Sequence, residues 1–153
     1  VALLGTTNDV SDFNTHDVCK QASPAVQAVC NWFGPTDFLR MNDFKSRIDH
    51  DSPSSPESKF IGGSIQKNKQ QVARANPITY DSKSDPPMLI MHGDVDQLVP
   101  FNQSELLIAA LRKQKVESTL YKVKRGDHGF GGAVDKPEKL FKLVVNFFDK
   151  QLK

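Results

Sequence analysis

The clearest structural signal in this 153-residue chain is the stretch Asp85-Pro-Pro-Met-Leu-Ile-Met-His-Gly-Asp-Val-Asp-Gln-Leu-Val-Pro100. Within it, Met88-Leu-Ile-Met91 is a short apolar run, with Pro86-Pro87 before it and His92-Gly93 after it. A run of this length between turn-forming residues predicts a buried strand with sharp ends. Asp96 would then lie just beyond the carboxyl end of that strand.

Two more strands are expected, one on each side of this run in the sequence. Residues 26–33, Val-Gln-Ala-Val-Cys-Asn-Trp-Phe, are rich in β-branched and aromatic residues and are closed by Gly34-Pro35. That pattern predicts a buried strand that ends in a turn. Residues 117–123 alternate, with Thr119, Tyr121 and Val123 on one side, which indicates a third strand.

Two helices are expected, over residues 102–115 and 136–152, because each range has apolar residues at helical spacing. Asn102 or Ser104 is available to cap the first helix, and Pro137 suits the first turn of the second. The apolar residues are Leu106, Leu107, Ala110 and Leu111, then Leu140, Leu143, Val144, Phe147 and Phe148. Strands alternating with helices predict an α/β fold with a mainly parallel sheet, whose functional residues gather at the carboxyl ends of strands.

Residues 36–84 differ from this pattern. They are polar, carry scattered charges and are interrupted by Ser52-Pro-Ser-Ser-Pro56. We interpret them as a lid-like or cap-like excursion over the sheet, within a single domain that spans residues 1–153. Loops on a rigid scaffold commonly carry specificity.

Composition argues against several classes of partner. The net charge of +2 comes from 20 basic and 18 acidic residues, and no basic run is interleaved with aromatic residues, so nucleic acid is not expected to bind. No apolar stretch approaches the roughly 20 residues that span a bilayer. The chain starts with Val1 and not Met, so we expect a longer parent protein, for which a secreted or periplasmic location stays open.

Cys19 and Cys30 are the only cysteines, and the sequence leaves open whether they form a disulfide or stay as buried thiols. Neither has a second ligand at zinc-finger spacing. Asp94 and Asp96 begin like a calcium loop, but the next ligand position is the apolar Leu98. No metal and no cofactor are therefore expected.

Gly126-Asp-His-Gly-Phe130 follows the third predicted strand. Asp96 and His128 would thus lie at the same edge of the sheet, where a carboxylate can fix the tautomer of an imidazole while its other nitrogen takes a serine proton. We predict that they are the acid and base of a catalytic triad. His92 at the end of its strand is expected to make a structural hydrogen bond, and His16 and His50, in polar stretches, to be exposed.

A convincing nucleophile is absent from the sequence. Ser64 in Gly62-Gly-Ser-Ile-Gln66 lacks the second glycine of a G-x-S-x-G elbow and does not follow an apolar strand, so it is interpreted as a turn serine. Ser104 is interpreted as a helix cap.

Taken together, these segments resemble the C-terminal half of an α/β-hydrolase of the lipase and esterase group, which includes feruloyl and acetyl-xylan esterase-like (BD-FAE-like) proteins. The resemblance covers nearly the whole chain. The segments that carry it are residues 26–38, 75–80, 85–100, 103–107 and 126–130.

The resemblance implies that Asp96 and His128 are the triad acid and base of a serine-type carboxylic ester hydrolase. Val1 to Thr7 looks like the remainder of the helix that follows a nucleophile elbow, so the serine and the oxyanion loop are expected upstream of Val1. This chain alone is then expected to be inactive. The implied substrate is a small-molecule or polysaccharide-linked ester, with Trp32, Phe33 and Phe130 lining its pocket.

Two alternatives stay open. A prolyl-oligopeptidase-type serine peptidase shares a similar Pro-Pro-strand-His-Gly-x-x-Asp segment, and a non-catalytic binding protein descended from a hydrolase would keep Asp96 and His128 as relics. Either way, absent upstream strands would leave a sheet edge exposed. The expected partner of that edge is the N-terminal half of the same fold or, in a dimer, a second copy of the chain.

Overall fold

The structure is a computed structural model that describes residues 1–13, 23 and 25–153. Within this described part, the sheet has three parallel strands in the order β1-β2-β3. They are β1 (Val29–Trp32), β2 (Met88–Gly93) and β3 (Ser118–Val123). The predicted α/β fold with a parallel sheet is confirmed.

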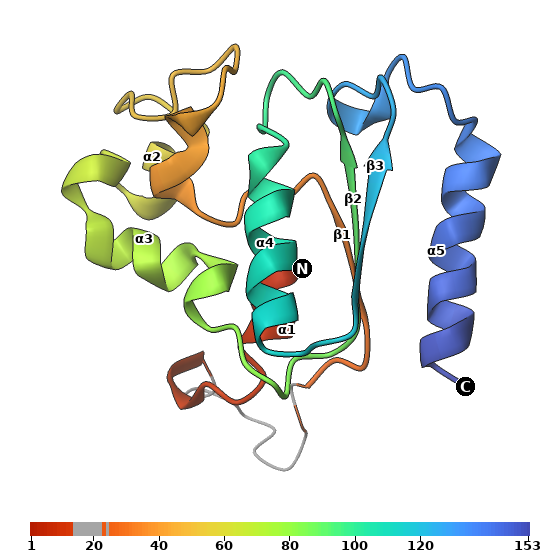
Figure 1. The fold of residues 1–153 in the computed structure, drawn as a ribbon. Coiled ribbons are helices and arrows are strands. Elements are labelled where there is room, and N and C mark those ends of the chain that lie inside the picture. The colour runs from red at the N-terminus through yellow and green to blue at the C-terminus, as the bar shows by residue number, and fades with distance from the viewer. Residues whose placement is uncertain (14–22, 24) are drawn as a thin grey trace.

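Helices cover both faces of this sheet (Figure 1). The helix α4 (Asn102–Lys113) and the short α1 (Ala2–Thr6) pack on one face, and α5 (Pro137–Gln151) packs on the other. β2 is buried along its whole length because it has a strand on each side and a helix layer on each face. This explains why its sequence is a continuous apolar run and does not alternate.

Successive residues of a strand point to opposite faces, so the sheet supports two separate cores. On the α4 side the buried apolar residues are Ala2, Val29, Met88, Ile90, Leu107, Ile108, Leu111 and Val116. On the α5 side they are Leu89, Met91, Val123 and Leu140. Each large side chain among them contributes roughly 1.5–3 kcal/mol by burial, and together they hold the carboxyl ends of the strands in place.

The first strand is shorter than predicted. It ends at Trp32 because the backbone of Phe33 turns to a φ of 41°, although the Phe33 amide still donates to the carbonyl of Met91 (2.9 Å). The other strands and both long helices match their predicted ranges to within two residues.

The predicted cap of α4 is wrong. The helix starts after Phe101 without a side-chain cap. Asn102 instead donates from Nδ2 to the carbonyl of Arg40 (3.2 Å), and Ser104 is fully buried inside the helix. Both polar side chains are engaged in tertiary hydrogen bonds, which local capping rules do not anticipate.

The excursion, residues 36–84, is an ordered segment with a small apolar core of its own formed by Phe38, Ile65 and Val72. Its regular elements are η2 (Phe38–Asp43), α2 (Pro56–Ile61), η3 (Ile65–Lys67), α3 (Lys69–Ala75) and η4 (Pro77–Thr79). Figure 1 shows α2 and α3 on the far side of α4 from the sheet, and η2 and η4 contact α4. The role of this segment as a lid stays a prediction.

The loops that follow β2 and β3 approach each other at two glycines. A Cβ on Gly93 would lie 2.0 Å from the carbonyl oxygen of Gly126, and the Val95 amide donates to that same oxygen (3.2 Å). The two loops can lie this close only because residue 93 is a glycine. The contact brings the loop that carries Asp96 beside the loop that carries His128.

We predict that Gly93→Ala lowers the free energy of unfolding by about 1–3 kcal/mol or more, because the new methyl group forces these backbones apart. Urea denaturation of wild type and variant measures the change. Gly131→Ala is the matched control, since a Cβ at Gly131 meets no atom within 4 Å. Equal stability of the two variants would contradict the close approach.

Candidate active site

The turn after β2 holds the Asp96 carboxylate in a fully buried position. Its Oδ1 accepts hydrogen bonds from two backbone amides of the same loop, Leu98 (2.8 Å) and Val99 (2.9 Å). These bonds fix the direction of the carboxylate. Its second oxygen, Oδ2, is directed toward the loop that follows β3.

His128 begins the 3₁₀ helix η5 (His128–Phe130) in that loop, and its Nδ1 lies 3.0 Å from Asp96 Oδ2. The side chain is 34% exposed, while that of Asp96 is 0% exposed. An ionised carboxylate only accepts hydrogen bonds, so the proton of the neutral ring lies on Nδ1. Nε2 is then left as the basic nitrogen, and it bonds to no serine or cysteine among the described residues.

Burial alone would raise the pKa of Asp96, but hydrogen bonds from two histidines and two backbone amides outweigh burial and lower the pKa to about 2. The carboxylate is therefore ionised at neutral pH. This is the charge state that holds an imidazole in one tautomer and stabilises the imidazolium when the ring takes a proton.

His92 makes the structural hydrogen bond predicted for it, to the carbonyl oxygen of Val99, and its ring also lies beside Asp96. Its Nε2 lies 3.2 Å from Asp96 Oδ2 and 2.9 Å from the carbonyl oxygen of Val99. The ring is fully buried, and its Nδ1 lies 2.7 Å from Ser104 Oγ. Burial keeps His92 away from solvent, so His128 is the more accessible of the two imidazoles.

Asp127 was missed by the sequence analysis. Its Oδ1 accepts hydrogen bonds from the amides of Gln97 (2.9 Å) and His128 (2.8 Å), so it joins the acid loop to the base loop. These two bonds lower the pKa of Asp127. Its position directly before a short helix was the available signal, since Asp commonly caps such turns.

The prediction that His50 is exposed is wrong. His50 is fully buried, with Nδ1 3.0 Å from Glu57 Oε2 and Nε2 3.2 Å from Ser46 Oγ. Ser46 Oγ is in turn 3.0 Å from the carbonyl oxygen of Gln97. His50 and Glu57 are surrounded by polar residues in the sequence and meet only when the excursion folds, so their burial was not predictable from local pattern. Through Ser46, this pair is also connected to the loop that follows β2.

Ser64 lies in the turn before η3, as predicted for a turn serine. His16 and Cys19 lie outside the described residues. Cys30 is half-buried, and burial raises the pKa of its thiol. No cluster of three His, Cys, Asp or Glu side chains that could hold a metal ion occurs in the part of the chain that the structure describes, and no described helix is long and apolar enough to cross a membrane.

Of the three aromatic residues predicted to line a pocket, Phe33 packs directly on His128, and Trp32 and Phe130 pack on each other and on Phe33. The Phe33 ring centroid is 4.4 Å from that of His128 and 5.2 Å from that of Phe130, and Trp32 and Phe130 meet edge to face at 5.4 Å. Trp32 and Phe130, with Phe141 of α5, line a cavity of about 330 Å³. Phe33 thus packs on His128, while Trp32 and Phe130 line the cavity; neither Phe33 nor His128 is among its lining residues.

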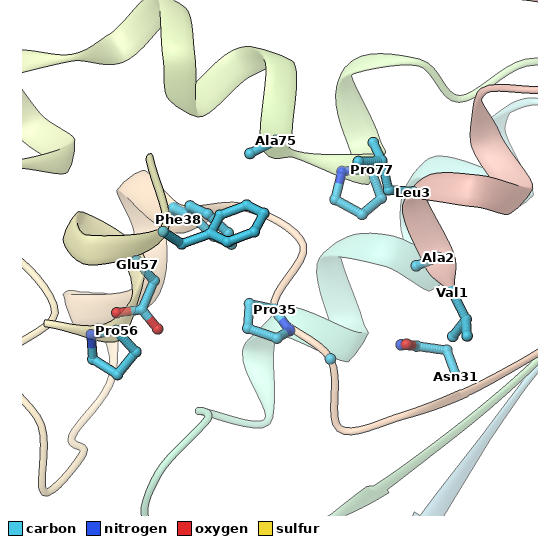
Figure 2. Close-up of a pocket in the computed structure, with 12 residues that line it drawn as sticks. Val1, Ala2, Leu3, Asn31, Pro35, Phe38, Pro56, Glu57, Ala75 and Pro77 are labelled. Carbon is cyan, nitrogen blue, oxygen red and sulfur yellow. The ribbon is translucent and has the colours of Figure 1, made fainter. Parts of the chain in front are cut away.

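A larger pocket of about 550 Å³ lies between the start of α1 and the excursion. Figure 2 shows Asn31 and Ala2 at one end of it and Phe38 and Pro56 at the other. Asn31 is only 3% exposed, and its Nδ2 has no hydrogen-bond partner among the described residues. A buried donor without an acceptor lowers the free energy of unfolding by about 1–3 kcal/mol. An acceptor placed in this pocket beside Asn31 Nδ2 would therefore be stabilising.

Known proteins resemble this chain over most of its length. The BD-FAE family model matches residues 1–111. A solved truncated carbohydrate esterase from gut microbiota is 30% identical, with a TM-score of 0.81 over 98% of this chain and 54% of the other. The probable carboxylic ester hydrolase LipM of Mycobacterium tuberculosis is 28% identical over 67% of this chain and 23% of its own.

The uncharacterised peptidase YuxL of Bacillus subtilis is 28% identical over 50% of this chain and 12% of its own length. The chain therefore spans about half of the solved esterase and less than a quarter of either curated relative.

We predict that Asp96→Asn removes a pH-dependent part of the stability. The folded pKa of about 2 lies below the ordinary 3.8, so the ionised carboxylate stabilises the fold above about pH 4, and this stabilisation is lost as the pH falls toward 2. The difference in unfolding free energy between wild type and variant should be about 2 kcal/mol larger at neutral pH than at pH 2. Urea denaturation at a series of pH values measures it, with the exposed Asp12→Asn as control. A constant difference across the series would show that Asp96 is not held as described.

Proposed function

This chain belongs to the BD-FAE family of esterases with the α/β-hydrolase fold, and from this premise we propose that it supplies the acid, Asp96, and the base, His128, of a serine carboxylic ester hydrolase. The observation that carries the proposal is the 3.0 Å contact between His128 Nδ1 and the buried Asp96 Oδ2, which leaves Nε2 as the basic nitrogen.

The proposed reaction is acyl transfer. A serine hydroxyl attacks the ester carbonyl while His128 Nε2 takes its proton, and the resulting imidazolium returns that proton to the leaving alcohol. Water then attacks the acyl carbon while the same nitrogen takes its proton, and the imidazolium returns that proton to the serine oxygen as the carboxylic acid leaves. Asp96 stays ionised throughout and stabilises the imidazolium, and general acid and base assistance of this kind contributes roughly 10²–10⁴ in rate.

The serine and the oxyanion donors are proposed to come from upstream of Val1, in the N-terminal half of the same fold. Three observations support this. The chain spans 54% of the solved esterase, β1 pairs only with β2 and so forms an edge of the described sheet, and the Asn31 donor in the pocket of Figure 2 lacks a partner among the described residues.

The apolar surface around this pocket fits the same partner. Val1 and Phe60 line it and are 75% and 72% exposed. Water-exposed apolar groups beside an unpaired sheet edge favour association with more chain. In the absence of the upstream half, a second copy of this chain would pair with the same edge.

The proposed substrate is a small-molecule or polysaccharide-linked ester. The cavity lined by Trp32 and Phe130 offers apolar surface, and Phe33 joins Phe130 to His128 by ring contacts on both. Such surfaces suit an acyl or aromatic group held close to Nε2 of His128.

One observation favours a second candidate, a serine peptidase that uses the same two residues, because the Bacillus subtilis relative is named as a peptidase. Acylated peptides and simple carboxylic esters distinguish the two candidates, since a peptidase would cleave the amide and an esterase would spare it. A non-catalytic descendant would turn over neither.

We predict that the 153-residue chain alone has no appreciable turnover of p-nitrophenyl acetate, because it lacks the attacking hydroxyl. The longer protein that includes the residues before Val1 should hydrolyse the ester, and an organophosphonate should label a serine in the added part. Asp96→Asn should lower kcat by about 10⁴-fold and His128→Ala by about 10⁶-fold.

Ser64→Ala is the control and should leave activity unchanged. If the 153-residue chain hydrolysed p-nitrophenyl acetate and its His128→Ala variant did not, the proposal of an upstream nucleophile would be wrong. A longer protein that is neither labelled nor active would favour the non-catalytic alternative, and activity that survives both substitutions would overturn the assignment of Asp96 and His128.

A further inference from the structure

Four donors surround the Asp96 carboxylate, two on each oxygen. The Leu98 and Val99 amides hold Oδ1, while the rings of His92 and His128 meet at Oδ2. Of the two histidines, only His128 has a role in the proposed reaction. A second imidazole on the oxygen that the base uses therefore needs its own explanation.

The protonation of His92 follows from its neighbours. Its Nε2 lies within hydrogen-bond distance of two groups that only accept, Asp96 Oδ2 (3.2 Å) and the carbonyl oxygen of Val99 (2.9 Å), so Nε2 carries a proton. In the neutral ring Nδ1 then has a lone pair. Ser104 Oγ, 2.7 Å away, donates its hydroxyl proton to that lone pair.

The surroundings hold this arrangement in place. His92 and Ser104 are both 0% exposed. The Phe101 ring packs edge to face on the His92 ring at 5.4 Å, and Phe33 contacts it from another side at 6.5 Å. A buried ring that has a partner on each nitrogen has one orientation and one tautomer. His128, by contrast, sits on a partly exposed loop.

We propose that His92 is a positioning residue for the Asp96–His128 pair and that Ser104 fixes the orientation of the His92 ring from its Nδ1 side. This inference rests on the proposed ester-hydrolase function. His92 holds Oδ2 at the point where His128 meets it, so the carboxylate keeps its direction while the base gains and loses a proton. Ser104 acts one step further back, because loss of its hydroxyl leaves His92 Nδ1 without a partner and leaves the ring anchored at Nε2 only.

The first test uses nitrogen-15 NMR of the 153-residue chain, which needs no activity. In wild type, His92 should be neutral with its proton on Nε2, and the Nδ1 proton of His128 should exchange slowly with water. In Ser104→Ala that exchange should become faster by up to about tenfold, the range expected for the loss of one hydrogen bond. Ser58→Ala is the matched control, because Ser58 is also a buried helical serine but bonds in the excursion.

A second pair of variants separates positioning from packing. His92→Gln keeps an N–H donor near Asp96 Oδ2 and should retain slow exchange at His128, whereas His92→Leu fills the space without a donor and should lose it. In the longer protein, His92→Leu should lower kcat by up to about 100-fold with little change in KM, the scale that a small misplacement of a catalytic group produces. If His92→Leu does not fold, Ser104→Ala still tests the proposal.

The inference would be overturned if the His128 Nδ1 proton exchanged with water at the wild-type rate in both Ser104→Ala and His92→Leu. It would also be overturned if His92→Gln and His92→Leu raised that exchange rate equally. These outcomes differ from a failure of the proposed function, which would appear as an unlabelled serine in the longer protein and would leave the NMR results of the short chain as they are.

Discussion

A single buried carboxylate organises the carboxyl end of this sheet. Asp96 accepts hydrogen bonds from two backbone amides and the His128 imidazole, and the His92 imidazole lies 3.2 Å from its Oδ2. The energy of removing its charge from water is offset only while these groups stay in place. The loop after β2 and the loop after β3 therefore both depend on this one carboxylate. The first turn of α4 is connected to it through the Ser104–His92 hydrogen bond. Loss of one donor would affect the remaining three.

The fold supplies the geometry that this group requires. Parallel pairing of β2 with β3 puts both loops at the same edge, and the Gly93–Gly126 contact removes the side chain that would separate them. Asp127 adds a second connection by accepting hydrogen bonds from both loops. The Ser46 hydroxyl and the Arg47 amide of the excursion donate hydrogen bonds to the carbonyl oxygen of Gln97. The excursion is therefore also attached to the loop that carries Asp96.

Local patterns in the sequence predicted the strands and long helices of the sheet layer, and they singled out Asp96 and His128. The apolar run of β2 between prolines and a His-Gly pair gave the central strand, and the spacing of leucines gave α4 and α5. Asp96 and His128 were identifiable because each sits in a short motif directly after a predicted strand. These features depend on residues close together in the chain, where sterics and periodicity act without reference to the remaining structure.

Other features depend on side chains that meet only after folding. Ser104 looks like a helix cap, yet it bonds to His92, and His50 looks exposed, yet it is buried with Glu57. In both cases a polar residue satisfies its hydrogen bonds with a tertiary partner, and burial then makes that partner obligatory. The sequence alone thus predicted the three strands, the two long helices and the proximity of Asp96 and His128. The direction of the Asp96 carboxylate, its second imidazole and the attachment of the excursion required packing, because they arise from contacts between segments that no local pattern relates.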